Sequence, residues 1–132
     1  MSTMEPHQPK KLAFAGNSHQ AYTSFPEHIQ QDGGYQLHLI QNGREPADFK
    51  PFPQVGTGVY ELRLDDEQNE YRVMYVAKLG DMVWVLHAFQ KKSQATRKSD
   101  VDIAKAAYST LQRTLLEEKA AEKKLKGKAK NK

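Results

Sequence analysis

The chain has 132 residues, a formal net charge of +4 and no cysteine. This length favours one domain, large enough to bury a core without a disulfide or a structural metal. Without cysteine, disulfides, a thiolate nucleophile and a thiolate metal site are excluded. No apolar run reaches membrane-spanning length, and the N-terminus lacks the apolar segment of a signal peptide. We therefore expect a cytoplasmic protein with no membrane contact.

The positive charge is concentrated at the C-terminal end. Residues 117–132 contain seven lysines and three glutamates, which gives that segment a charge of +4. Residues 1–116 contain 13 Lys and Arg against 13 Asp and Glu, so this larger part is neutral. The overall charge is thus no evidence that the body of the protein binds nucleic acid, and any such evidence must come from the positions of charges.

The N-terminal part predicts one strand and two helices. Residues 1–10 are polar and contain two prolines, so we expect them to be disordered. An apolar run over Lys11–Ala15 is a candidate first strand, and Ser18 is a candidate N-cap for a helix over His19–Phe25. Pro26–Gln41 is expected to be mostly helical, with an interruption or bend at the Gly33-Gly34 pair because glycine disfavours helix.

The middle of the chain predicts a loop followed by an antiparallel meander. Residues 44–58 contain three prolines and two glycines and are expected to be loop. Val59–Leu64 is expected to be a strand, followed by two strands over Tyr71–Leu79 and Met82–Gln90. Gly80-Asp81 fits the two-residue turn of a β-hairpin. In that register Leu79 faces Met82, Tyr75 faces Leu86, Met74 faces His87 and Arg72 faces Phe89.

Alternation along the hairpin divides its side chains between two faces. The face expected to be core is apolar and holds Tyr71, Val73, Tyr75, Ala77, Leu79, Met82, Trp84, Leu86 and Ala88. The other face is half apolar and cationic along its length, and it holds Arg72, Met74, Val76, Lys78, Val83, Val85, His87, Phe89 and Lys91. We expect functional residues on the second face.

A C-terminal helix follows a polar link. Ser99 and Asp102 resemble a capping box that starts this helix. Apolar residues then recur at helical spacing and predict a stripe on the core: Val101, Ala104, Tyr108, Leu111 and Leu115. Because this periodicity ends near Leu116, we expect a domain over residues 11–116 and a lysine-rich tail over residues 117–132.

The cationic face of the hairpin is the candidate site. Pairing of the strand Val59–Leu64 with its neighbour places Arg63 beside Arg72, and two adjacent cations repel unless an anion lies between them. Lys91 and Lys92 come from the neighbouring strand, and His87 and Phe89 share the face. Arginine suits phosphate oxygens, and an exposed aromatic ring can stack on a base. This pattern favours an RNA phosphate site.

An alternative interpretation needs no ligand: the two arginines pair with acidic neighbours, and the face is ordinary solvated surface. The candidate acids are Glu61, Asp65 and Glu70. Elsewhere, the remaining histidines lack metal-ligand spacing, and no GxSxG motif is present. The VGTGV segment precedes a strand, unlike a nucleotide-binding loop. We expect no metal and no cofactor.

The order KPF-x5-GVYELR, YRVMYVAKL, VWVLHAFQKK and SDVDIAKAAY resembles the RelE/HigB-type toxins, specifically their phage-derived branch. The match covers residues 11–115, and LHAFQKK after YRVxY is its most specific part. The resemblance implies an α+β fold, a RelE-like antiparallel sheet packed by N-terminal helices and a C-terminal helix. It also implies a cognate antitoxin, usually with a helix-turn-helix DNA-binding domain.

The activity implied by the resemblance is that of the toxin of a type II toxin–antitoxin system. Such toxins are ribosome-dependent mRNA endonucleases that inhibit translation, and they need no metal. Carried onto this chain, Arg63 and Arg72 stabilise the phosphate, Lys91 or Lys92 adds charge, and His87 or Glu61 transfers a proton. The resulting catalytic candidates are Arg63, Arg72, His87 and Lys91, and the RNA-binding candidates are Lys50, Lys78, Phe89 and Lys92.

Two alternatives remain open at this point. Relatives with the same sheet inhibit DNA gyrase and lack nuclease residues, and a non-catalytic binding module would keep only a partner surface. The glutamate at position 61, on a strand where better-known members concentrate lysines, departs from the family pattern. There is also no equivalent, after Lys92, of the tyrosine or acid–histidine group with which some members end.

Overall fold

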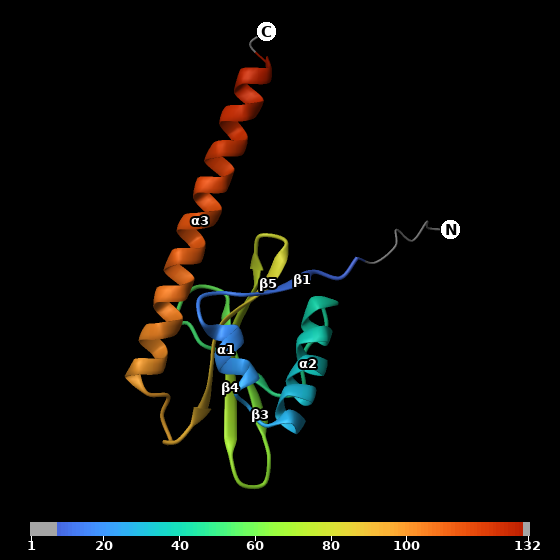
Figure 1. Cartoon of the computed structure of the whole chain (residues 1–132), viewed down its shortest axis with the longest axis vertical. Coiled ribbons are helices and arrows are strands. Elements are labelled where there is room, and N and C mark those ends of the chain that lie inside the picture. The colour runs from blue at the N-terminus through green and yellow to red at the C-terminus, as the bar shows by residue number, and fades with distance from the viewer. Residues whose placement is uncertain (1–7, 131–132) are drawn as a thin grey trace, which may run out of the picture.

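The computed structural model describes the backbone of residues 8–130 and the side chains of residues 8–126. The elements in chain order are β1 (Lys11–Phe14), α1 (Ser18–Thr23), α2 (Glu27–Gln41), β2 (Phe49–Pro51), β3 (Val59–Asp65), β4 (Glu70–Leu79), β5 (Met82–Lys91) and α3 (Lys98–Lys130). The strands form one five-stranded sheet in the order β1-β5-β4-β3-β2. Figure 1 shows the course of the chain from β1 to α3. The predicted α+β fold, with N-terminal helices and a C-terminal helix, is confirmed.

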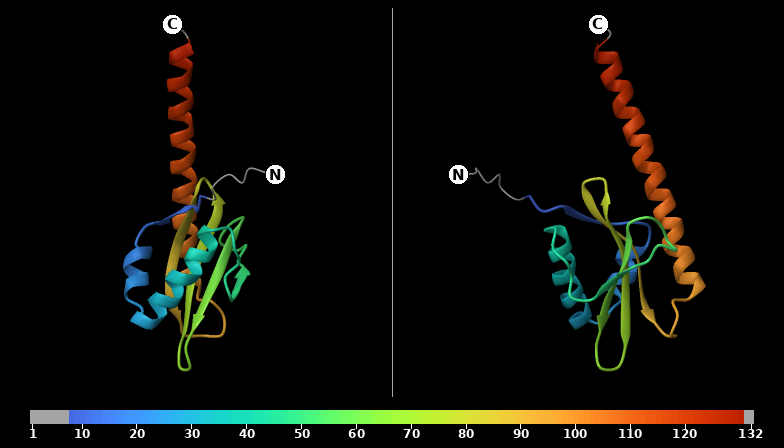
Figure 2. Two further views of the ribbon diagram at one scale, coloured as in Figure 1. Left: turned by 90° about the vertical axis from the view of Figure 1, so that its right-hand side faces the viewer. Right: turned by 180° about the vertical axis from the view of Figure 1, so that it is seen from behind.

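Helices cover both faces of this sheet. The right-hand view of Figure 2 shows α2 on one side of the strands and α3 on the other. On the first face, α1 and α2 pack Tyr22, Ile29 and Leu37 against β3, β4 and β5. On the second face, α3 packs Ala104, Tyr108 and Leu111 against the same strands. Both faces are therefore core, with one hydrophobic cluster each.

The helix α2 runs without a break through Gly33 and Gly34, so the predicted interruption is wrong. Pro26 is its N-cap, with Glu27 in the first turn, where a carboxylate suits the helix dipole. A methyl group on Gly33 would lie 2.6 Å from the Tyr22 hydroxyl and 3.0 Å from a methyl of Leu64. The glycine at position 33 thus serves close packing between α2, α1 and the sheet.

The predicted meander of β3, β4 and β5 is confirmed, as is the turn at Gly80-Asp81. Gly80 has a φ of +74°, a conformation that glycine adopts without strain. Three of the four predicted hairpin pairs are also present, but Tyr75 faces Val85 instead of Leu86. The register shifts between Met74 and Tyr75 and again between Val76 and Leu79.

These shifts make the predicted division of the hairpin into a core face and a functional face wrong along β5. Val83 and Val85 pack with α1 and α2, whereas Trp84 and Leu86 pack with α3. A bulge adds one residue to a strand and so reverses the alternation beyond it. As a result Leu86 and His87, although consecutive, both lie on the α3 side.

Two edge strands complete the sheet. The strand β2 lies in the segment predicted to be loop, and Pro51 is tolerated there because the strand is at an edge. At the opposite edge, β1 pairs in parallel with β5, with Leu12 beside Val83. Residues 1–7 of the expected disordered N-terminus lie outside the described residues, and Lys10 exchanges two hydrogen bonds with Gln41, both 2.8 Å long.

The apolar stripe predicted for the C-terminal helix is confirmed, but the start of the helix differs from the prediction. The helix α3 begins at Lys98, so Ser99 lies inside it and the predicted capping box is wrong. Its far end continues to Lys130, well beyond Leu116, and projects away from the body (Figure 1). None of the described helices combines the length and the apolar character needed to cross a bilayer.

Candidate functional site

The candidate residues gather on the α3 face of the sheet, at the end where α3 begins. Three rows of cross-strand neighbours run over β2, β3, β4 and β5. The first row is Lys50, Glu61, Met74 and His87; the second is Arg63, Arg72 and Phe89; the third is Asp65, Glu70 and Lys91. We call the ionisable residues of these rows the charged cluster. The predicted adjacency of Arg63 and Arg72 is confirmed.

Glu61 is the centre of the charged cluster. Its side chain is fully buried, and its Oε1 lies 3.7 Å from Arg72 Nε, 3.8 Å from Arg63 Nε and 3.8 Å from Lys50 Nζ. The anion between the two arginines is therefore a carboxylate of the protein itself. A buried carboxylate needs such partners, since burying an unpaired charge is costly.

The Arg72 guanidinium donates hydrogen bonds to two carboxylates and a backbone carbonyl. Its Nη1 donates to Asp65 Oδ1 at 2.7 Å and to the Tyr71 carbonyl at 2.9 Å, and its Nη2 donates to Glu70 at 3.0 Å. The side chain is only 3% exposed. The pairing of this arginine with acidic neighbours, one of the two interpretations of the sequence, describes its geometry.

Arg63 is more open than Arg72. Its side chain is 31% exposed, and its closest carboxylates, on Glu61 and Asp48, lie 3.8 and 3.9 Å away. At these distances no hydrogen bond is made, so the guanidinium keeps donors for another anion. Lys91 and Lys92 make no ion pair with any described residue, and they line a hollow of about 470 Å³ next to the cluster.

His87 is oriented by a carboxylate from α3. Its Nε2 lies 2.8 Å from Asp100 Oδ1, and its ring stacks on Phe89 with centroids 5.2 Å apart. Nδ1 has no hydrogen-bond partner among the described residues. A neutral ring with its hydrogen on Nε2 donates to Asp100 and leaves the Nδ1 lone pair free to accept a proton.

The segment 92–97 closes one side of the cluster. Thr96 Oγ1 donates to Glu61 Oε2 at 3.2 Å, which ties this segment to β3. Four residues after Thr96, in the first turn of α3, the hydrogen bond between His87 Nε2 and Asp100 ties the helix start to β5. The link between β5 and α3 therefore contacts both candidate proton-transfer residues.

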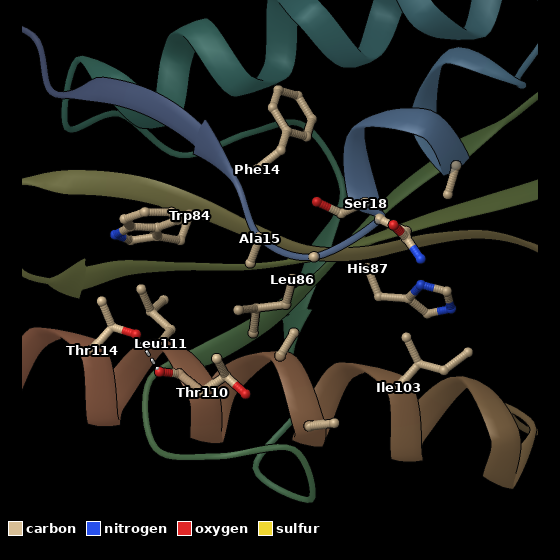
Figure 3. A pocket seen from close by; sticks show the side chains of 15 residues that line it. Phe14, Ala15, Ser18, Trp84, Leu86, His87, Ile103, Thr110, Leu111 and Thr114 are labelled. Carbon is tan, nitrogen blue, oxygen red and sulfur yellow. Dashed lines mark hydrogen bonds between the residues drawn. The ribbon is translucent and has the colours of Figure 1, made fainter.

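His87 also borders an apolar groove of about 670 Å³. The groove lies between α1 and α3, over β5. Figure 3 shows His87 towards one end and Trp84 towards the other, with Phe14 and Ser18 on the α1 side and Ile103 on α3. His87 thus belongs to the charged cluster and also lines this groove.

The structure brings the predicted site residues together, except for Lys78, and it buries Phe89. Lys78 is exposed near the far end of β4, six residues and about 20 Å along the strand from Arg72. Phe89 is buried, and its ring covers His87, so it offers no open surface to a base. Lys50, an RNA-binding candidate, instead neighbours Glu61.

Asp100 and Thr96 are the residues that the sequence did not reveal. Both lie in or next to a segment whose pattern indicated a helix cap, so their contacts with the sheet were hidden. An acidic residue 13 positions after a histidine carries no recognisable spacing, because the two meet only through the fold. In the described part of the chain, no three His, Asp or Glu residues are grouped so that they could hold a metal.

A mixed sheet with helices on both faces and an ion-pair cluster at one end defines a small α+β protein. The model of one family, described as Phage derived protein Gp49-like (DUF891), matches residues 21–109. The chain belongs to this family, whose members are related to the toxins of toxin–antitoxin systems. Membership implies an antitoxin partner, without assigning the chain to RelE or HigB. No curated protein is similar enough to count as a relative.

Proposed function

We propose that the chain is the toxin of a type II toxin–antitoxin system and cleaves translated mRNA on the ribosome without a metal. Its antitoxin would carry a helix-turn-helix DNA-binding domain. The family supports a toxin, and one observation supports a nuclease. His87, which Asp100 orients, lies in the same row as the buried Glu61, and Arg63 beside Glu61 is partly exposed.

The proposed reaction is attack by a ribose 2′-oxygen on the adjacent phosphorus. A P–O2′ bond forms as the P–O5′ bond breaks, which leaves a 2′,3′-cyclic phosphate and a free 5′-hydroxyl. His87 Nδ1 takes the proton from the 2′-hydroxyl, and Asp100 stabilises the imidazolium that results. The leaving 5′-oxygen takes a proton from water, and the His87 imidazolium returns its proton to water after cleavage.

The cations have different tasks in this proposal. Arg63 and Lys91 stabilise the extra negative charge on the phosphate, because they keep free donors near the surface. Arg72 acts through Glu61 and holds the cluster together, which makes it a positioning residue. Lys92, exposed at the edge, contacts the RNA backbone.

A second candidate, a non-catalytic binding module, is favoured by a specific observation. The buried Arg72 is already neutralised by three carboxylates, and Thr96 covers Glu61 from the side of α3. A phosphate that needed Arg72 would have to displace these contacts. In this second reading the cluster stabilises the fold, and only the partner surface carries function.

Expression of the chain alone in a bacterium, with mRNA ends mapped by primer extension, separates the candidates. The nuclease gives new ends inside translated frames, and His87→Asn abolishes them. The matched control is His38→Asn, because His38 is exposed on α2, on the opposite face of the sheet. Circular dichroism of both purified variants checks that they fold like the wild type.

The other outcomes are also informative. Growth arrest with intact mRNA and induced DNA damage would point to gyrase inhibition. Cleavage that persists in His87→Asn would remove His87 from the chemistry. If expression of the chain has no effect on growth or on mRNA, the result would support the non-catalytic binding module.

A further inference from the structure

The C-terminal part of α3, residues 117–130, stands apart from the rest of the molecule. Both views in Figure 2 show this helix projecting beyond the sheet and the other helices. Every described side chain from Leu116 to Lys126 is exposed. Contacts of α3 with the body end near Leu115, which packs at the edge of the second hydrophobic cluster. We call residues 117–130 the arm.

Core packing does not explain this helix, whereas local interactions favour it. The arm continues a helix that is already nucleated, so each added residue avoids the nucleation cost. Alanine, lysine, leucine and glutamate have high helix propensity, and Lys126 pairs with Glu122 at 3.7 Å. A helical extension whose described side chains are all exposed is free to present its surface to a partner.

The surface that the arm presents is cationic. Lys119, Lys123 and Lys126 follow at spacings of four and three residues, which places them on one side of the helix over about 10 Å. The segment 117–132 carries +4, whereas residues 1–116 are neutral. All of the excess charge of the protein is therefore on or just beyond the arm, which fits a polyanionic partner.

The arm lacks the features of a membrane or coiled-coil helix. Leu125 is the large apolar side chain of the arm and is 71% exposed, and Leu116, the residue before the arm begins, is 67% exposed. They are nine residues apart, about 900° of helical rotation, and so project from opposite sides. No apolar stripe is available for a lipid surface or a second copy of the chain.

We propose that the arm binds the phosphate backbone of double-helical RNA. A double helix carries about one phosphate charge per 1.7 Å of axis, so about six phosphates lie along the three lysines. Lysine contacts to phosphate give affinity without sequence preference. The interaction is additional to the proposed cleavage, and only the choice of RNA over DNA rests on that proposed function.

The test uses the full chain and a labelled RNA duplex of 20 base pairs and mixed sequence, with binding followed by fluorescence anisotropy at several KCl concentrations. The variant K119Q/K123Q/K126Q should bind about tenfold or more weakly at 0.1 M KCl. Its plot of log affinity against log salt should flatten by up to about 2.7, which is 0.9 for each lost phosphate contact.

The matched control K11Q/K98Q/K105Q removes the same charge from exposed positions outside the arm and should retain the affinity and salt slope of the wild type. Equal losses in both triple variants, or no loss in the arm variant, would overturn the proposal. So would binding to a DNA duplex alone, or arm-dependent binding to phosphatidylglycerol vesicles without RNA binding.

The outcome is separable from that of the proposed nuclease. K119Q/K123Q/K126Q leaves His87 and the charged cluster in place, so its loss of duplex binding can be measured whether or not the wild type cuts mRNA. A protein that binds RNA through the arm but does not cut it would therefore refute only the nuclease.

Discussion

The buried Glu61 determines the roles that its two arginine neighbours can have. Two arginines side by side on adjacent strands predict an anion between them, and a phosphate is one possible anion. In the structure the anion is the Glu61 carboxylate, which lies within 4 Å of both guanidinium groups. The two arginines are therefore not equivalent: Arg72 is enclosed by protein, and Arg63 is partly open.

Replacing the two arginines separately should reveal this difference. Arg72→Ala leaves Glu61 buried with one strong partner fewer, and we expect a loss of about 3–5 kcal/mol in the free energy of unfolding. Arg63→Ala removes a partly solvated ion pair, and we expect a loss of about 1 kcal/mol or less. Urea unfolding measures both values. Equal losses would contradict the structural role assigned to Arg72.

Tyr75 makes a prediction about alkaline pH. Burial raises the pKa of Tyr75 well above its usual value of 10.0, with smaller contributions from Tyr60 and Glu45. Because the folded pKa is raised, stability is unaffected below about pH 10. Above that pH it falls, since the unfolded chain releases the proton first.

Tyr75→Phe should remove this loss. Between pH 10 and 12 the free energy of unfolding of the variant should fall less steeply than that of the wild type, by about 1 kcal/mol per pH unit. Denaturant unfolding at each pH provides the measurement. Tyr35→Phe, at an exposed position of α2, is the control and should keep the wild-type slope. Parallel curves for Tyr75→Phe and the wild type would argue against the burial effect.

At the scale of elements, patterns that depend on local sequence were predictable. The three-stranded meander, the Gly80-Asp81 turn and the apolar stripe of α3 all follow from alternation, turn chemistry and helical spacing. The faces of β5 did not follow, because a bulge depends on how two strands pair and leaves no mark in the composition. The strand β2 was hidden for a similar reason, since Pro51 disfavours every strand except an edge strand.

Some features of the candidate site were likewise predictable from the sequence, and others were not. The neighbourhood of Arg63, Arg72, Phe89 and Lys91 was predictable from the register of adjacent strands. The burial of Glu61 and the pairing of His87 with Asp100 were not, because both depend on how the link between β5 and α3 lies on the sheet. Such contacts arise only when distant segments pack.

Gly33 and Gly34 are consecutive glycines, but they differ in how much space a methyl group would have. A methyl group on Gly33 would meet the Tyr22 hydroxyl, which donates to the Gln30 carbonyl, and Leu64 of the sheet. A methyl group on Gly34 would meet no atom within 4 Å. The first position is therefore constrained by packing, and the second carries only the helix cost of glycine.

Gly33→Ala should lower the free energy of unfolding by about 1–2 kcal/mol, because overpacking outweighs the gain in helix propensity. Gly34→Ala should raise it by up to about 1 kcal/mol, since alanine favours helix without a clash. Each variant is the control for the other, and thermal and urea unfolding measure both. Stabilisation by both substitutions would mean that α2 adapts to the added methyl group at little cost.

For the whole molecule, the main division is between a neutral body and a cationic arm. The body buries both faces of its sheet with α1, α2 and the first half of α3. The arm adds length and charge without adding buried surface. Stability and net charge are thus carried by different parts of the chain, and they should respond separately to truncation.

Deletion of residues 117–132 tests this separation. The net charge falls from +4 to 0, while every residue of both hydrophobic clusters remains. We expect the free energy of unfolding to change by no more than about 0.5 kcal/mol, as for exposed positions in general. The helical signal in circular dichroism should fall, because the residues removed include the helical arm. A loss of more than about 2 kcal/mol would show that residues beyond Leu116 support the core.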